Sequence, residues 1–555
     1  MKKYVCSILT VLCSALCCFA LGSCGGASIV LDAPEDLVMT KHWVLDWYEV
    51  LDATSYVVTL NTGETYETED TQLDMQFLTP GETYTISVYA KGGKKDGVRY
   101  LDSEPSELTL TMPAVSEGLT YTLIEDGTAY EVSGENFLGA EILILPDTYK
   151  EKPVTQIARA GFYRKIMTGI RFPQRLKTIC PSAFSLAELE KVVFPSALQE
   201  IGNYAFSQTN LQEITIPQEV TKIGGAAFRN CETLSKVTML PVTLDLGGRI
   251  FEGTAWYDNQ PNGYIYFGNT LYRYKGDFSK NTHLDLEDFD EKKIASRAFF
   301  ECRGIVSVDI PASVDMGEQV FKNCTDLKTV RLAEGLTEIP AGTFGGCTQI
   351  TEIELPSTLV VIGADAFSGT SIEELVFPKS LRKIGDSAFA GTSIEELVFP
   401  KSLQEIGYSA FYNCNNLKTV LLNDGLETIE DDAFASCDNL LGLDIPESVV
   451  FDGRMGYIPY LEWLSFSFFD GDFSYQETFG KLYSLEHIYI RATQEEILAM
   501  KEENENFYLF CRTQTMTLSG KTCKKILYAY SEDPPTEDGK YWHYDTDGVT
   551  PIAWE

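Results

Sequence analysis

The sequence GTSIEELVFPKSL occurs twice, at residues 369–381 and at 391–403, and an Ala-Phe pair ends eight residues after each copy. A weaker form of this unit covers most of the chain, as Leu-x-x-Ile-Gly-x-x-Ala-Phe, a turn, and Leu-x-x-Ile-x-Leu-Pro. Its phenylalanines follow one another every 22 or 23 residues, with one gap of 48: Phe162, Phe184, Phe206, Phe228, Phe251, Phe299, Phe321, Phe344, Phe367, Phe389, Phe411 and Phe434. A period of this length predicts stacked coils, because one coil alone cannot bury its Leu, Ile and Phe side chains.

Within each coil the apolar residues alternate over a short stretch, as in residues 327–332, which indicates a β-strand. A proline often follows and ends the pairing because it has no N–H. The sequence therefore predicts a mostly β fold in which a solenoid over residues 154–490 carries a parallel sheet along one face. Residues 114–153 are expected to cap its start, and residues 491–555 to form a C-terminal cap and tail.

This repeat resembles the BspA-type leucine-rich repeats of bacterial surface proteins, and the register of its Ala-Phe pair carries the resemblance. The resemblance covers roughly residues 118–490. It implies a role in adhesion to host matrix proteins or to other cells.

The gap of 48 residues contains an irregular insertion at residues 252–293. It is rich in Trp and Tyr, and we expect a hairpin with turns at Asn262-Gly263 and Gly268-Asn269. Its aromatic side chains either cover an irregular part of the stack or form a binding platform.

The N-terminus has the features of an export signal. Lys2 and Lys3 precede an apolar run that ends in Leu21-Gly22-Ser23-Cys24, which resembles a bacterial lipobox. We therefore expect residues 1–23 to be a lipoprotein signal peptide, Cys24 to carry lipid, and residues 24–28 to be a tether. An ordinary secretory signal is the alternative. The expected location is the cell surface or outer membrane, with membrane attachment only through the lipid.

Residues 29–113 show short alternating stretches between turn signals, as a β-sandwich requires. With Trp47 on an inner strand and Tyr84 at the place of a tyrosine corner, this segment resembles a fibronectin type III module. We expect the module to be a spacer.

Composition and motifs argue against several functions. The net charge of −37 disfavours nucleic acid as a partner, because the field of the protein repels phosphate. The four histidines are scattered, and no metalloprotease, serine-hydrolase or phosphate-loop motif is present. We expect no catalytic residues, no metal and no cofactor, and thus not an enzyme.

Six cysteines stand three residues after a repeat phenylalanine, where shorter coils have threonine: Cys231, Cys302, Cys324, Cys347, Cys414 and Cys437. A position that accepts Cys or Thr indicates a packing role. Cys511 and Cys523 lie outside the repeat, and a disulfide between them is an open possibility in an exported protein.

The two residues that flank the central apolar residue of each strand should point outward on one shared sheet. Early coils place Gly169 and Arg171, then Lys191 and Val193 there, which predicts a basic face. Later coils predict an acidic and apolar stripe, consisting of Glu352, Glu354, Glu374, Val376, Glu396, Val398, Thr419 and Leu421. Exposed valines beside carboxylates are unusual on a solvated strand. The stripe is therefore the predicted partner surface, and the alternative is a solvated ladder copied by duplication.

The predicted function is adhesin-like binding of host matrix or cell-surface proteins without catalysis. Glycan or nutrient capture through the insertion aromatics is one alternative, and an architectural role in the envelope is another.

Overall fold

A computed structural model describes residues 28–96, 98–239, 245–288, 293–451, 456–466, 484–485, 487–492, 515–518, 521–524, 526–530, 540–544 and 551–553. Within these ranges, helix is confined to α2 (Ala255–Asp258) and two 3₁₀ turns, Glu125–Gly127 and Leu286–Asp288. The fold is mostly β, as predicted. No helix of the described part is long and apolar enough to cross a membrane.

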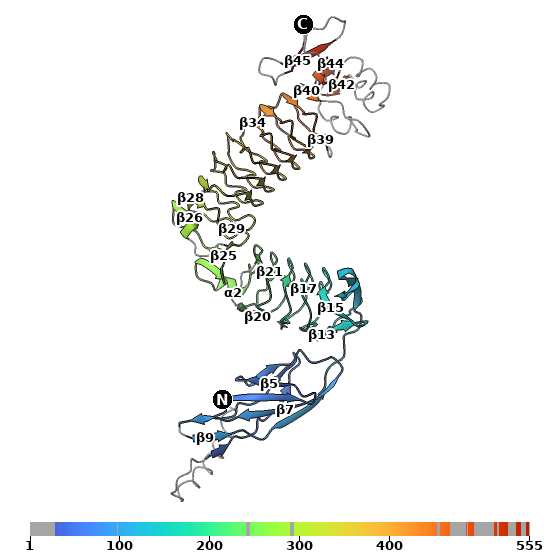
Figure 1. Ribbon diagram of the computed structural model, residues 1–555, viewed down its shortest axis with the longest axis vertical. Coiled ribbons are helices and arrows are strands. Elements are labelled where there is room, and N and C mark those ends of the chain that lie inside the picture. The colour runs from blue at the N-terminus through green and yellow to red at the C-terminus, as the bar shows by residue number, and fades with distance from the viewer. Residues whose placement is uncertain are drawn as a thin grey trace, which may run out of the picture. The chain divides into compact units, whose positions relative to one another are not determined.

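The chain divides into two compact units. The first consists of Met1–Leu198 and Gln208–Pro217, and the second of Gln199–Ser207 and Gln218–Glu555. The first contains an N-terminal β-domain and the early coils, and the second contains the later coils (Figure 1).

The N-terminal β-domain has ten strands: β1 (Ser28–Val30), β2 (Val38–Met39), β3 (Val44–Asp46), β4 (Ser55–Leu60), β5 (Thr65–Thr68), β6 (Gln72–Asp74), β7 (Thr83–Lys91), β8 (Lys94–Lys95), β9 (Val98–Leu101) and β10 (Ser106–Thr111). They form sheets in the orders β10-β7-β4-β5, β2-β3-β6 and β1-β9-β8. Leu45 of β3 shares a buried core with Val58 of β4 and Ile86 of β7. Two of the sheets therefore pack on each other.

The early coils belong to the same unit. Their strands are β11 (Thr120–Ile124), β12 (Ala129–Ser133), β13 (Ile142–Ile144), β14 (Thr148–Tyr149), β15 (Lys152–Ile157), β16 (Gly169–Arg171), β17 (Thr178–Ile179), β18 (Lys191–Val192) and β20 (Glu213–Ile216). β13, β16 and β18 pair in parallel on one side of the coils, and β12, β15 and β17 on the other. β11 pairs antiparallel with β12 at the start of the stack.

The second unit repeats this arrangement over many coils. One side carries the longer strands β22 (Lys236–Met239), β26 (Thr282–Asp285), β28 (Ile305–Ile310), β30 (Thr329–Leu332), β34 (Glu396–Val398), β36 (Thr419–Leu421), β38 (Gly442–Asp444), β40 (Trp463–Phe466), β41 (His487–Ile490) and β44 (Ile526–Tyr530). The other side carries a ladder of shorter strands, namely β19 (Glu200–Ile201), β21 (Lys222–Ile223), β23 (Asp245–Leu246), β27 (Lys293–Ile294), β29 (Asp315–Met316), β31 (Glu338–Ile339), β32 (Val361–Ile362), β33 (Lys383–Ile384), β35 (Glu405–Ile406), β37 (Thr428–Ile429) and β39 (Val450–Phe451). Neighbouring strands on both sides pair in parallel (Figure 1).

The repeat phenylalanines form continuous internal stacks, as the period predicts. Phe162 and Phe184 stack in the first unit with ring centroids 5.4 Å apart. In the second unit the run from Phe299 to Phe434 continues with spacings of 5.2 to 5.9 Å between neighbouring rings. These rings are almost completely buried. Stacked coils therefore supply the core that no single coil has.

The insertion forms a hairpin of β24 (Gly263–Phe267) and β25 (Thr270–Lys275) that turns at Gly268-Asn269, as predicted. The predicted turn at Asn262-Gly263 is wrong, because Gly263 already pairs with Lys275. β25 also pairs in parallel with β27, so it takes the place of a ladder strand.

Several aromatic side chains of the insertion pack against the stack, and two of them, Phe267 and Tyr272, are buried. The rings of Trp256, Phe267 and Tyr272 all contact Phe251. The Tyr272 hydroxyl accepts a hydrogen bond from the Phe251 N–H. Tyr264 and Tyr266 remain more than one third exposed. The insertion therefore bridges the gap in the phenylalanine stack with other rings.

The last described strands are β42 (Thr515–Leu518), β43 (Lys521–Lys524), β45 (Tyr541–Tyr544) and β46 (Pro551–Ala553). Trp542 is buried, and its indole N–H donates to the carbonyl of Ile490. Trp542 of the tail therefore packs against the coil that contains Ile490.

Candidate functional site

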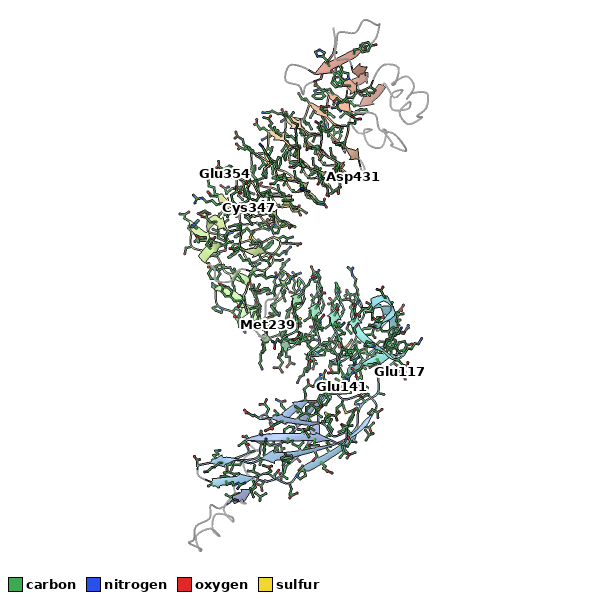
Figure 2. The ribbon with its side chains drawn as sticks, viewed as in Figure 1. Glu117, Glu141, Met239, Cys347, Glu354 and Asp431 are labelled. Carbon is green, nitrogen blue, oxygen red and sulfur yellow. The ribbon has the colours of Figure 1, made fainter. Side chains whose placement is uncertain are left out.

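The longer strands of each coil form what we call the strand face. Its first column is the residue before the central apolar residue of each strand, and its second column is the residue after it. Parallel pairing aligns each column across coils, as in Glu396 with Thr419 and Val398 with Leu421. In Figure 2, Glu354 of the second column and Asp431 lie on opposite sides of the stack.

In the first unit the N-terminal β-domain covers this face at β13, β16 and β18, whereas β20 remains exposed. The Arg171 side chain is only 1% exposed. Its guanidinium donates to the carbonyls of Gln76 and Leu78 in the β-domain, both at 3.1 Å, and to the carbonyl of Leu145 at 2.9 Å. It also forms a two-point ion pair with Asp147, at 3.0 and 2.7 Å. The prediction that this part of the face is open and basic is therefore wrong.

Neighbouring residues extend the covered area. An added Cβ on Gly169 would lie 2.7 Å from Nδ1 of His42 in the β-domain. Ile144 belongs to the buried core of the β-domain, although it lies on the first coil. Lys191 of the third strand is close enough to lower the pKa of His42, after the larger effect of burial. The N-terminal β-domain thus packs on β13, β16 and β18 of the early coils.

In the second unit the strand face carries, on β26, β28 and β30, a polar cluster that sequence reasoning missed. His283 Nδ1 lies 2.8 Å from Ser307 Oγ, and His283 Nε2 lies 3.9 Å from an Asp309 carboxylate oxygen. Arg331 approaches the same oxygen at 3.7 Å. The histidine–aspartate separation is too long for the hydrogen bond that orients a catalytic base. The cluster is best described as a polar network on a solvated sheet.

The acidic stripe follows on the next four coils. We use this name for the eight predicted residues: Glu352, Glu354, Glu374, Val376, Glu396, Val398, Thr419 and Leu421. All are exposed except Leu421, which is half-buried. Val376 is 84% exposed and Val398 is 52% exposed, while the central residues between the columns are buried. The structure therefore brings the stripe together as predicted, with a weaker contribution from Leu421.

The carboxylates of the stripe differ from most charged groups nearby. None of its four glutamates takes part in an ion pair with another described residue. On the short-strand ladder of the same unit, charges pair across neighbouring coils, as in Lys222 with Glu200 at 3.0 Å. Lys293 pairs with Asp315 there at 3.4 Å. The stripe consequently presents negative charge that no ion pair with a described residue neutralises. On the ladder, by contrast, lysines pair with carboxylates of neighbouring coils.

The sequence profile of the BspA type leucine rich repeat region matches residues 155–261, 272–392, 337–457 and 382–497. These matches cover more than half of the 555 residues. The chain belongs to the BspA-type leucine-rich-repeat family.

Solved structures of similar fold come from several bacteria. A leucine-rich repeat protein from Bacteroides ovatus is 24% identical over 61% of this chain and 98% of its own, with a TM-score of 0.24. A leucine rich cell surface protein from Faecalibacterium prausnitzii is 21% identical over 55% and 93%, with a TM-score of 0.27. The pneumococcal vaccine antigen PcpA is 18% identical over 75% and 93%, with a TM-score of 0.28. Comparison with curated proteins finds no match.

The repeat cysteines of this BspA-type chain are buried free thiols, as expected. In the 23-residue coils the thiol donates to the phenylalanine carbonyl of the preceding coil, as Cys324 does to Phe299 at 3.0 Å. Burial raises the pKa of Cys302 to about 11 and that of Cys347 to about 12. Cys302 and Cys347 are therefore packing groups and poor nucleophiles. Thr370 makes the analogous bond within its own coil, at 2.8 Å to the Phe367 carbonyl.

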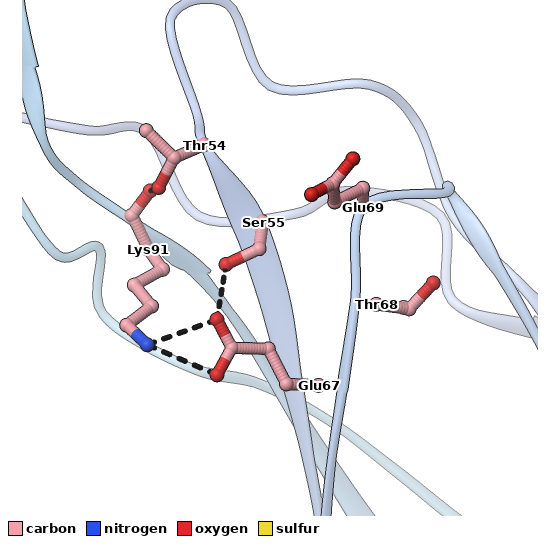
Figure 3. Close-up of a pocket in the computed structure, with 6 residues that line it drawn as sticks. All are labelled: Thr54, Ser55, Glu67, Thr68, Glu69 and Lys91. Atoms are coloured by element: carbon pink, nitrogen blue, oxygen red, sulfur yellow. Dashed lines mark hydrogen bonds and ion pairs between the residues drawn. The ribbon is translucent and has the colours of Figure 1, made fainter.

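Two concave regions of the BspA-type chain bind less plausibly than the stripe. A groove of about 740 Å³ runs beside the short-strand ladder of the second unit and includes the paired Lys222. A polar pocket of about 390 Å³ lies in the N-terminal β-domain (Figure 3). There Lys91 and Ser55 both contact the carboxylate of Glu67, at 2.9 and 2.6 Å. In the groove, Lys222 and Lys383 are paired with Glu200 and Glu405, and in the pocket Lys91 is paired with Glu67.

The remaining predicted site residues are not described. Cys24 and Cys511 lie outside the described residues, and the side chain of Cys523 in β43 is not described. The lipid site and the possible disulfide remain predictions.

A feature of the strand face that the sequence reasoning missed lies beyond the stripe. The ring of Trp463 covers Gly442, where an added Cβ would lie 1.8 Å from the indole. Gly169 is covered in the same way by His42. Glycine inside a strand often marks the close approach of another group, so Gly169 and Gly442 could have indicated that these two positions are covered.

Proposed function

We propose that this chain is a non-enzymatic, adhesin-like surface protein that binds a positively charged region of another protein through the acidic stripe. The observation that carries this proposal is the combination of four unpaired glutamates with two exposed valines on one face of neighbouring coils. Unneutralised carboxylates attract a cationic surface and speed its association. The valines gain free energy when a partner removes them from water.

The rest of the chain suits display at a cell surface. We propose that the export signal places lipid on Cys24 and that the N-terminal β-domain is a fibronectin type III-like module. Two observations support the module: its sheets of four and three strands, and the Tyr84 hydroxyl, which accepts a hydrogen bond from the Thr79 N–H at 3.2 Å. The docked Arg171 makes this module a fixed base for the early coils as well as a spacer.

Binding of the whole chain to a panel of host matrix proteins, cell-surface proteins and glycans tests the proposal. The test variant reverses the four stripe charges: Glu352→Lys, Glu354→Lys, Glu374→Lys and Glu396→Lys. The control variant reverses four exposed carboxylates outside the stripe: Glu219→Lys, Glu232→Lys, Asp424→Lys and Asp438→Lys. Both change the net charge equally, so a difference reports the position of the charge.

We expect the stripe variant to lose at least about 100-fold in affinity for protein partners, and the control to stay within about threefold. Equal binding by the stripe variant and the unaltered chain would rule out the stripe. Binding to glycans alone, abolished by Tyr264→Ala and Tyr266→Ala, would move the site to the hairpin. If the chain binds no member of the panel, an architectural role is favoured.

A further inference from the structure

The stripe is an uncovered sheet face with two parallel columns. The first column holds Glu352, Glu374 and Glu396 on consecutive coils, and Glu352 and Glu374 form a direct parallel bridge. The second column begins with Glu354 and continues with Val376 and Val398, which lie on the same coils as Glu374 and Glu396. Column members repeat with the strand spacing of about 4.8 Å, and the columns lie about 6.6 Å apart, two residues along a strand.

The distance between neighbouring coils determines whether a helix or an extended strand of a partner fits the stripe. A helix laid along the stack presents one turn every 5.4 Å or so, which drifts by only about 2 Å over three coils. Flexible Lys and Arg side chains absorb a drift of that size. An extended strand presents side chains on one face every 6.6 Å or so and drifts by about 5 Å over the same distance. A helix therefore stays in register with the columns, and a strand does not.

The chemistry of the columns selects the side chains of such a helix. Carboxylates of the first column require a line of Lys or Arg, and Val376 and Val398 require an apolar line beside it. Residues three and four apart in a helix form such lines. Lys418 lies at the border of the stripe, but it already pairs with Glu395 at 2.7 Å, so it does not neutralise the first column.

We infer that the acidic stripe accommodates a basic amphipathic helix of a partner protein, lying along the coil stack for about three turns. This inference rests on the proposed function and specifies its partner. Four coils span about 14 Å, which corresponds to about ten helical residues.

Three synthetic peptides of identical composition test this inference against the whole chain. The first is stapled as a helix, with Lys on one stripe and Leu on the adjacent stripe. The second is a stapled helix in which the same residues are scrambled around the axis. The third keeps the order of the first but contains D-residues that prevent a helix. Fluorescence anisotropy at low and physiological salt gives the dissociation constants.

We expect the first peptide to bind at least about tenfold more tightly than the other two. Val376→Ser with Val398→Ser should weaken the first peptide about tenfold and change the others little. Glu374→Lys with Glu396→Lys should weaken all three peptides, and the control pair Glu232→Lys with Asp438→Lys should not. Circular dichroism of each variant verifies that the coils remain folded.

Two failures are distinguishable. If all three peptides bind alike but respond to Glu374→Lys with Glu396→Lys, the helical partner is overturned and the cationic partner of the proposed function stands. If no peptide distinguishes the stripe variant from its control, both are overturned, because binding then follows only the net charge.

Discussion

The strand face is covered at β13, β16 and β18 of the first unit and open at the acidic stripe of the second, although the same repeat builds both. Arg171 and Arg331 occupy equivalent places in the second column. The Arg171 side chain is 1% exposed and bonded on all sides, whereas that of Arg331 is 76% exposed and approaches one carboxylate at 3.7 Å. The repeat therefore specifies which way a side chain points, and the neighbouring domain decides whether that side chain meets water.

This difference explains why the two parts of the face have different residues. The covered part has Gly169, Ile144 and an arginine whose hydrogen bonds are all satisfied by carbonyls and one carboxylate. The open part has carboxylates and valines without a partner among the described residues. The side chains of the docked face already have their contacts with the β-domain. The carboxylates and valines of the acidic stripe lack such contacts among the described residues, as expected of a surface that binds another protein.

The largest expected effect is the difference in stability between variants that lack Arg171 and variants that lack Arg331. Arg171→Ala removes a buried cation and leaves three carbonyls and Asp147 without their donor. We expect it to lower the free energy of unfolding of the first unit by about 3–5 kcal/mol. Arg331→Ala should change that of the second unit by less than about 0.5 kcal/mol. Urea unfolding with hydrogen-exchange mass spectrometry locates each effect.

The exchange data decide between docking and mere proximity. Faster exchange at residues 74–79 and 142–145 in Arg171→Ala is expected, because these segments meet at the guanidinium. Unchanged exchange there would mean that the β-domain does not depend on this contact.

A smaller loss of stability is expected when a larger side chain replaces Gly169 in the first column. Gly169→Val places methyl groups where His42 and the end of Ile142 already lie, at 2.7 and 2.8 Å from the added Cβ. Overpacking of this kind costs about 1–3 kcal/mol. Thr329→Val at the equivalent exposed place should be nearly neutral. Equal midpoints of thermal unfolding for the two variants would show that the face at Gly169 opens easily.

Much of the fold could be predicted because a solenoid depends on local periodicity. The 22- or 23-residue spacing predicted the phenylalanine stacks, and alternation predicted which residues of Glu352 to Thr419 lie outside. Contacts between nearby coils connect residues about one period apart, so a single sequence contains their register.

What could not be predicted depends on contacts between distant segments. Arg171 reaches residues 93 and 95 positions away, and no periodicity connects them. The contact between His283 and Ser307 could be predicted only with the exact backbone path of the insertion. A local trace of the covered face is the strand residue Gly169, which leaves room for His42.

The smallest effect is a dependence on pH at the covered face. Burial, followed by Lys191 and Lys41, holds the pKa of His42 below its ordinary value, while Glu190 and Glu141 oppose this. The folded unit thus binds fewer protons than the unfolded chain between the lowered pKa and about 6.5. Stability is complete above about pH 6.5 and falls as the pH drops below it, because protonation favours the unfolded chain.

We therefore expect the urea midpoint of the first unit to fall between about pH 8 and about pH 6, and His42→Gln to reduce that fall. Asp74 acts in the opposite sense at lower pH, because burial raises the pKa of its carboxyl and its protonation favours the folded unit. Measurements restricted to this range keep the two groups apart. An identical pH response in His42→Gln would assign the dependence to other groups and would leave the docked face insensitive to the histidine that touches Gly169.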